Sequence, residues 1–225
     1  MSDGELLGSE DDLIARYGVS RPTLRQAAAL ISQENLLKVK RGVGGGYFAR
    51  QPSTRAVAHM AAIYLRSRRT EVREIIEAVA PIRIALARFA SNNGDKKLLA
   101  SLRRFLDKEM EQGPEQRFKD FVKAEREFGR LLGELGENRV IALFMETLYD
   151  FSSMLSVDED IYVKNPERVS DYRIRRNQLA EAILEQDEEL AAVAARRCSM
   201  ISADWYSDDL GGKRGSMLLE VFGMN

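Results

Sequence analysis

The stretch Gly18-Val19-Ser20-Arg21-Pro22-Thr23-Leu24-Arg25 decides the fold of the first quarter of the chain. Gly18 can adopt the left-handed conformation that ends a helix, and Ser20 is a favoured N-cap for the helix that follows. Arg21 and Arg25 are four residues apart and so share one helical face. The stretch is therefore typical of the turn and second helix of a helix-turn-helix.

The flanking residues extend this pattern on both sides. Ser9 is predicted to cap a first helix, with Asp12 as its partner three residues later. The second helix should end near residues 34–35 and bury one apolar face, which consists of Leu24, Ala27, Ala28 and Ile31.

A β-hairpin is predicted directly after the second helix. Residues 37–40 alternate apolar and basic side chains, residues 41–46 are rich in glycine, and residues 47–49 form the returning strand. The glycines at 42, 44 and 46 lack the G-x-G-x-x-G spacing of a nucleotide-binding loop, and no helix follows at once. The hairpin is therefore interpreted as the wing of a winged helix-turn-helix.

Charge is distributed unevenly along the chain. The formal net charge is −1, yet residues 13–55 contain eight Lys and Arg residues against one acid, a local charge of +7. Such asymmetry indicates one phosphate-facing module on an otherwise acidic protein. The single cysteine, Cys198, fits a reducing compartment, and without an apolar run of membrane-spanning length we expect a cytoplasmic protein.

The remaining sequence shows only helical periodicity. Residues 56–210 are expected to form an all-α bundle of about six or seven helices, and Pro81 should kink or break the first long one. The predicted fold is mainly α: a winged helix-turn-helix at 1–50, a linker at 51–55, the helical domain at 56–210 and a C-terminal tail at 211–225. A polar loop is expected at 158–165.

The residues around the opening stretch resemble the GntR winged-helix domain. Thirteen positions carry this resemblance: Leu7, Ser9, Glu10, Gly18, Val19, Ser20, Arg21, Thr23, Leu24, Arg25, Leu30, Leu36 and Gly42. The helical remainder is similar to the FCD domain of the FadR-type subfamily, through Glu74, Pro81, Phe128, Asn138, Ala182, Ile183 and Asp187. The resemblance implies a bacterial transcriptional regulator, usually a repressor, that acts as a homodimer and responds to a small metabolite.

The DNA-binding residues are expected on the second helix and the wing. Arginine suits bidentate contact with guanine O6 and N7, and short hydroxyl side chains can contact phosphate. The predicted set is Ser20, Arg21, Thr23, Arg25, Lys40, Arg41 and Gly42. Two departures from the family stand out. Asp11 stands where a basic residue is common, which is expected to alter target recognition. The family's first helix would precede Met1, which suggests a truncated or misplaced start and is expected to weaken the winged-helix core.

The effector site is expected in the helical domain at Glu125, Arg176 and Cys198. Many FCD domains bind a metal through one Asp and three His, and the positions corresponding to these ligands are Glu125, Gly129, Arg176 and Cys198. Gly129 has no donor and Arg176 would repel a cation, so neither a metal nor another cofactor is expected. Arg176 either offers its charge to an anionic effector, such as an organic acid or acyl-type metabolite, or is a surface or salt-bridged arginine.

The sequence thus favours a DNA-binding transcriptional regulator. The alternative is a helical ligand-binding protein with a degenerate DNA-binding domain, which Asp11 would favour. An enzyme is not expected, because the chain has a single histidine, His59, and lacks a nucleophile elbow.

Overall fold

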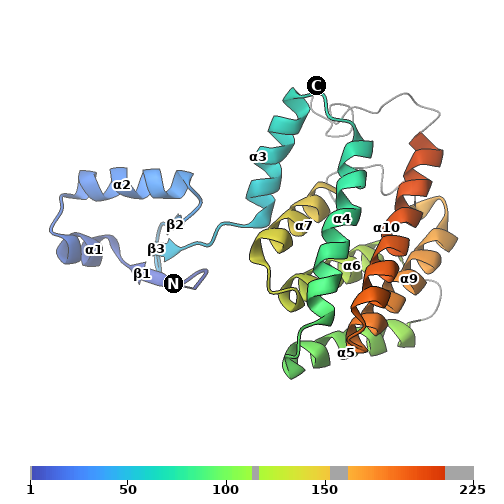
Figure 1. Ribbon diagram of the computed structural model, residues 1–225. Helices are drawn as coiled ribbons and strands as arrows, with labels where there is room; N and C mark the ends of the chain where they lie inside the picture. Colours follow the sequence, from blue (N-terminus) through green and yellow to red (C-terminus); the bar gives the residue numbers. More distant parts are fainter. Residues whose placement is uncertain (1, 113–116, 153–161, 211–225) are drawn as a thin grey trace. The chain divides into compact units, whose positions relative to one another are not determined.

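The computed structural model describes residues 2–112, 117–152 and 162–210, and the chain divides into two compact units, Met1–Ala56 and Val57–Asn225 (Figure 1). Residues 158–161 of the polar loop expected at 158–165, and the whole tail expected at 211–225, lie outside the described residues, and residues 162 and 163 are helical.

The first unit is a winged helix-turn-helix. Its elements are β1 (Leu6–Gly8), α1 (Glu10–Tyr17), α2 (Arg21–Gln33), β2 (Leu37–Lys40) and β3 (Gly46–Ala49). The predicted helices and hairpin are confirmed. Strand β1 was not predicted: it pairs antiparallel with β3, Leu6 opposite Phe48, and completes a sheet of order β1-β3-β2.

The core of this unit lies between the two helices and the sheet. It is built from Leu13, Leu24, Ala28, Leu37 and Tyr47. The predicted apolar face of α2 is only half correct. Leu24 and Ala28 are buried, but Ala27 is exposed and Ile31 is 44% exposed, because no described element of this unit covers that side of α2.

The second unit is all-α in its described residues, as predicted. Its helices are α3 (Thr54–Ser67), α4 (Val72–Ser91), α5 (Lys96–Glu111), α6 (Phe118–Leu135), α7 (Arg139–Ser152), α9 (Pro166–Leu184) and α10 (Glu188–Leu210). Because α3 already begins at Thr54, the non-helical connection after β3 is residues 50–53.

Helix α4 continues through Pro81, so the expected break is wrong. Proline removes one backbone hydrogen bond, which would otherwise run to the carbonyl of Glu77, four residues earlier. Both Pro81 and Glu77 are exposed. Water can therefore satisfy the freed carbonyl, and the buried face of α4 packs without interruption.

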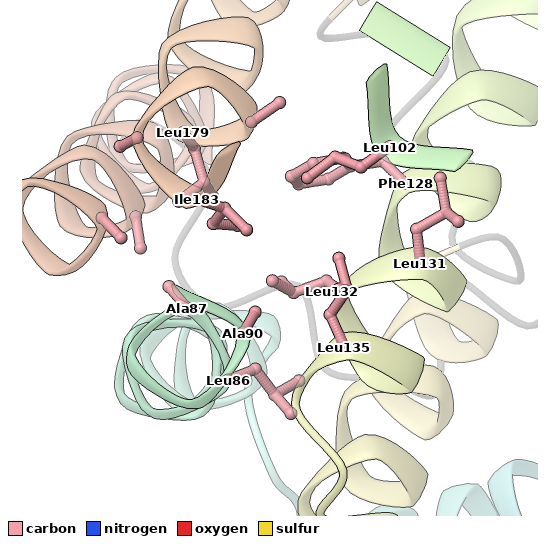
Figure 2. Close-up of a cluster of buried hydrophobic side chains, with 14 of the residues drawn as sticks. Leu86, Ala87, Ala90, Leu102, Phe128, Leu131, Leu132, Leu135, Leu179 and Ile183 are labelled. Atoms are coloured by element: carbon pink, nitrogen blue, oxygen red, sulfur yellow. The ribbon is translucent and has the colours of Figure 1, made fainter. Parts of the chain in front are cut away.

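The main core lies where α4, α5, α6 and α9 meet (Figure 2). Leu86 on α4, Leu102 on α5, Leu132 on α6 and Leu179 on α9 are each less than 2% exposed. Helix α10 packs along α4 and α9 and contributes alanines to this core, whose small side chains allow close approach of the helices. No described helix combines the length and hydropathy that crossing a bilayer requires.

Candidate functional site

Helix α2 begins with the cap that the sequence predicts. Gly18 has φ 62° and ends α1, and the Ser20 side chain accepts a hydrogen bond from the Thr23 backbone N–H. The Ser20 and Thr23 hydroxyls also lie 2.7 Å apart and hydrogen-bond to each other. This cap positions the exposed N-terminal turn of α2, which carries Arg21.

Two carboxylates of α1 hold the arginines of α2. Glu10 accepts two hydrogen bonds of 3.1 Å from Arg25, and its Oε1 lies 2.9 Å from Nε of Arg21. Asp11 accepts from Nη2 of Arg21 at 2.7 Å. The hydrogen bond from Arg25 lowers the pKa of the Glu10 carboxyl. Both guanidinium groups are thus oriented, and they remain 57% and 64% exposed.

Glu10 also connects the wing to this pair of helices. The hydroxyl of Tyr47 on β3 donates to Glu10 at 3.4 Å, and the Tyr47 ring is buried. Burial, together with the neighbouring Glu10 carboxylate, raises the pKa of Tyr47. The carboxylate of Glu10 therefore joins α1, to which it belongs, to both α2 and β3.

The tip of the wing carries basic side chains on a glycine turn. Lys40 lies over the Phe48 ring at 4.4 Å, and Arg41 is exposed. Gly42 has φ 92°, in the left-handed region that favours glycine. A Cβ on Gly45 would lie 2.6 Å from the carbonyl oxygen of Lys40. The tight turn therefore depends on its glycines, and Lys40, Arg41 and Gly42 all lie on the exposed hairpin.

The acids of α1 change the charge of this unit. The window 13–55 excludes Glu10, Asp11 and Asp12. Over residues 1–56, eight basic residues face six acids, so the whole unit carries +2 rather than +7. Electrostatic attraction for phosphate is therefore concentrated on the wing rather than spread over the unit.

A second group of polar residues is buried in the helical unit around Glu125. Its Oε1 lies 3.1 Å from Nη2 of Arg83 and accepts from the hydroxyls of Tyr149 and Tyr172 at 3.1 and 2.6 Å. Its Oε2 accepts from Arg176 at 3.4 Å. Burial raises the pKa of both tyrosines, which therefore act as neutral hydrogen-bond donors to the carboxylate.

Arg176 joins this carboxylate to a second one. It is fully buried, donates to Glu109, and lies over the Phe105 ring at 5.1 Å. Arg173 also contacts Glu109, with Nε 3.2 Å from its Oε2. Arg176 is thus the salt-bridged arginine that one of the two sequence interpretations describes.

Cys198 lies at the edge of the same group. Its Sγ is 3.3 Å from Nη1 of Arg83, and the residue is 1% exposed. Burial raises the pKa of the thiol. The structure thus brings Glu125, Arg176 and Cys198 into one buried cluster, in which Arg83 connects the cysteine to Glu125.

Among the described residues, the cluster keeps two buried hydrogen-bond donors without an acceptor. Three arginines that are at most 6% exposed (Arg83, Arg173 and Arg176) face two buried glutamates (Glu109 and Glu125). Nε of Arg83 and Nε of Arg176 are buried without a hydrogen-bond partner among the described residues. An unpaired buried donor is costly, so the cluster has spare capacity for an anion or another acceptor.

Sequence reasoning missed Arg83, Glu109, Tyr149, Tyr172 and Arg173. A signal existed for Arg83, which stands between Ile82 and Ile84 and three residues before Leu86, on a strongly apolar helix. A charge at such a position is buried and needs partners. Nothing local in the sequence marks those partners, because they come from α6, α7, α9 and α10.

Known families match both units. The FCD domain matches residues 70–199, and the bacterial regulatory proteins of the gntR family match residues 1–45. The chain belongs to the GntR-type regulators that carry an FCD domain. The predicted family and fold class are thereby confirmed.

Individual relatives agree with this assignment. The Uxu operon regulator of Haemophilus influenzae is 28% identical over 152 residues, which are 67% of this chain and 53% of that protein. The chain thus spans about half the length of this curated relative. The structure of Streptococcus agalactiae GntR matches with a TM-score of 0.62 at 15% identity, covering 90% of each chain. That of E. coli McbR/YncC matches with 0.51 at 14% identity, covering 93% of this chain and 90% of the other.

The side chains at the positions that correspond to the metal ligands of many FCD domains do not suit a metal ion here. A Cβ on Gly129 would lie 2.3 Å from Cε2 of Tyr149, so a ring occupies the space a ligand there would need. The guanidinium of Arg176 contacts Glu109 and Glu125, where a metal would compete for the same carboxylates. The positive charge next to these two carboxylates is therefore the guanidinium of Arg176.

Proposed function

We propose that this GntR-type regulator binds duplex DNA as a homodimer and acts as a repressor in the cytoplasm. Arg21 and Arg25 would read guanine in the major groove. The observation that carries the proposal is the exposed pair of arginines, which the capped helix α2 and Glu10 hold side by side. Both would exchange carboxylate contacts for base contacts on binding.

The other residues of the interface would fix its position on the duplex. Ser20 and Thr23 lie exposed at the N-terminus of α2, where hydroxyls and backbone N–H groups suit a phosphate. Lys40, Arg41 and Gly42 on the wing would approach the minor groove next to it. Contacts of this kind position the protein without reading sequence.

The experiment is a selection of duplexes from a random library, followed by affinity measurements on the enriched sequence. Arg21→Ala should lose about 1–3 kcal/mol of discrimination between that sequence and random DNA. Arg73→Ala is the matched control, because Arg73 is also an exposed arginine paired with a glutamate, but lies on α4. Equal discrimination by wild type and Arg21→Ala would refute the assignment.

We further propose that the cluster around Glu125 and Arg176 responds to a small anionic metabolite, such as an organic acid or acyl-type compound. Support comes from the Nε atoms of Arg83 and Arg176, which are buried without a hydrogen-bond partner among the described residues. Cys198 would line the same site. An effector changes DNA affinity only as far as it prefers one arrangement of the dimer.

Calorimetry with a panel of carboxylates, in the presence of EDTA, tests this second proposal. A binding carboxylate should bind equally well with and without the chelator and should lose affinity in Arg83→Met. The control is Arg104→Met, an exposed arginine on α5. Binding that requires a divalent metal would contradict the proposal.

One observation favours the alternative of a helical binding protein with a degenerate DNA-binding domain. Glu10 and Asp11 pair with both arginines of α2, and carboxylates oppose phosphate. The slope of affinity for fragmented genomic DNA against salt concentration separates the two functions. A regulator releases several counterions on binding, whereas a degenerate domain shows no measurable slope.

The proposed role is binding rather than catalysis. His59 is exposed on α3, in a different place from the buried polar cluster. Within that cluster the carboxylates are paired with arginines and tyrosines. Such pairing suits recognition of an effector.

A further inference from the structure

The two acids at the start of α1 differ in how much of their hydrogen-bonding capacity is used. Glu10 is 27% exposed and accepts from Arg21, from Arg25 and from Tyr47. Asp11 is 81% exposed, and only its Oδ1 is bonded, to Nη2 of Arg21. Among the described residues, Oδ2 of Asp11 has no hydrogen-bond partner.

Arg21 keeps free donors next to this free acceptor. Its guanidinium has five N–H groups: Nε faces Glu10 and one N–H of Nη2 faces Asp11. The remaining donors are on Nη1 and Nη2, and the Arg21 side chain as a whole is 57% exposed. The Arg21–Asp11 pair therefore presents donors and an acceptor side by side at the start of the recognition helix.

A guanine and a neighbouring cytosine in the major groove offer hydrogen-bonding groups complementary to those of the Arg21–Asp11 pair. Guanine presents two acceptors, O6 and N7, whereas cytosine presents an amino donor, N4, which aspartate can accept. We propose that Asp11 is a specificity-determining residue, whose free carboxylate oxygen accepts from the N4 amino group of a cytosine beside the guanine that Arg21 reads. This inference rests on the proposed function, in which α2 enters the major groove.

The same carboxylate acts on general affinity in the opposite direction. A negative charge near the backbone repels phosphate, so Asp11 lowers binding to every sequence while favouring one. Removing it should therefore raise affinity for random DNA and lower discrimination at one base position. If Asp11 only repelled phosphate, its removal would raise affinity for all sequences equally and leave the base preferences unchanged. A loss of preference at one base position therefore shows that Asp11 reads a base.

The test is selection from a random duplex library by the full chain, with wild type, Asp11→Ala, Asp11→Asn and Arg21→Ala in parallel. Asp11→Ala should lose preference for cytosine at one position by about fivefold or more and keep the guanine preference that Arg21→Ala loses. Asp11→Asn keeps an acceptor oxygen without the charge and should retain part of the cytosine preference.

Glu34→Ala is the matched control. Glu34 is an exposed acid of the same unit that caps the other end of α2, so its removal changes the charge equally and should leave the base preferences intact. Identical motifs for wild type and Asp11→Ala would overturn this inference alone. A wild-type protein that enriches no motif would overturn the proposed function and this inference together.

Discussion

Glu109 is a buried carboxylate whose stability in this fold depends on its arginine partners. It is 2% exposed and contacts both Arg173 and Arg176, which are themselves buried. The cost of burying these charges is offset only while each has its partners. The cluster is therefore a set of mutually dependent residues rather than a sum of separate salt bridges.

Glu109→Gln should destabilise the protein by about 3–5 kcal/mol, because it removes a buried negative charge that faces the buried guanidinium groups of Arg173 and Arg176. Urea unfolding, followed by circular dichroism, measures the change. Arg130→Ala is the control: its pair with Glu134 lies on the surface of α6, so its loss should cost about 0–1 kcal/mol. Similar losses in both variants would contradict the view of the cluster as an interdependent network.

Gly129 leaves room for the Tyr149 ring. Gly129→Ala places a Cβ 2.3 Å from Cε2 of Tyr149, so the ring must move away from Glu125, to which its hydroxyl donates. We expect a loss of about 1–3 kcal/mol in unfolding free energy, as in other overpacked sites. Gly94→Ala is the control, because nothing lies within 4 Å of its Cβ. An unchanged midpoint for Gly129→Ala would show that the ring adjusts freely.

At the scale of elements, helix α4 tolerates a proline because of where that proline lies. Pro81→Ala should raise the free energy of unfolding by about 1–3 kcal/mol, since alanine is the better residue in a helix interior and restores a backbone hydrogen bond. The gain is reduced by the greater freedom of the unfolded chain. Urea denaturation of both proteins measures it.

Pro166→Ala is the control for this substitution. Pro166 begins α9, where proline replaces an N–H that has no partner within the helix. Its removal should give no gain in stability. An equal rise for both variants would mean that the gain does not depend on the position of Pro81 in the interior of α4, because the freer unfolded chain can only lower the stability of either variant.

Elements that depend on local signals could be predicted from the sequence. The capping box of Ser9 and Asp12, the left-handed Gly18 and the hairpin all form as expected. Strand β1 could not be foreseen, because Leu6 pairs with Phe48, more than forty residues away. Its three residues alternate too briefly to give a periodic signal.

In the candidate sites, too, contacts that depend on local sequence could be predicted, whereas contacts between distant helices could not. Arg21 and Arg25 follow from their spacing on one helix, and the structure places them side by side on Glu10. The partners of Glu125 come from three other helices, α4, α7 and α9, so only tertiary packing brings them together. A charged residue within an apolar stripe, such as Arg83, indicates that partners exist without saying which they are.

At the scale of the whole molecule, apolar side chains remain uncovered on the FCD domain. On α7, Val140, Leu143 and Phe144 are 63%, 37% and 55% exposed, at helical spacings of three and four residues. Helix α4, which packs against α7, exposes Phe89 at 46%. Exposed apolar side chains that share one helix face suit the self-complementary contact of the proposed homodimer.

Phe144→Glu should convert the proposed dimer to monomer, because two like charges would face each other across the two-fold axis. Light scattering at micromolar concentration measures the mass. Ile174→Glu is the control: Ile174 is equally exposed, at 52%, but lies on α9. The monomer should also bind DNA more weakly. In a dimer, the DNA-binding unit bound to one half-site keeps the second unit at a high effective concentration near the other half-site, and a monomer loses this advantage. A Phe144→Glu protein that stays dimeric with full DNA affinity would place the dimer contact on another face.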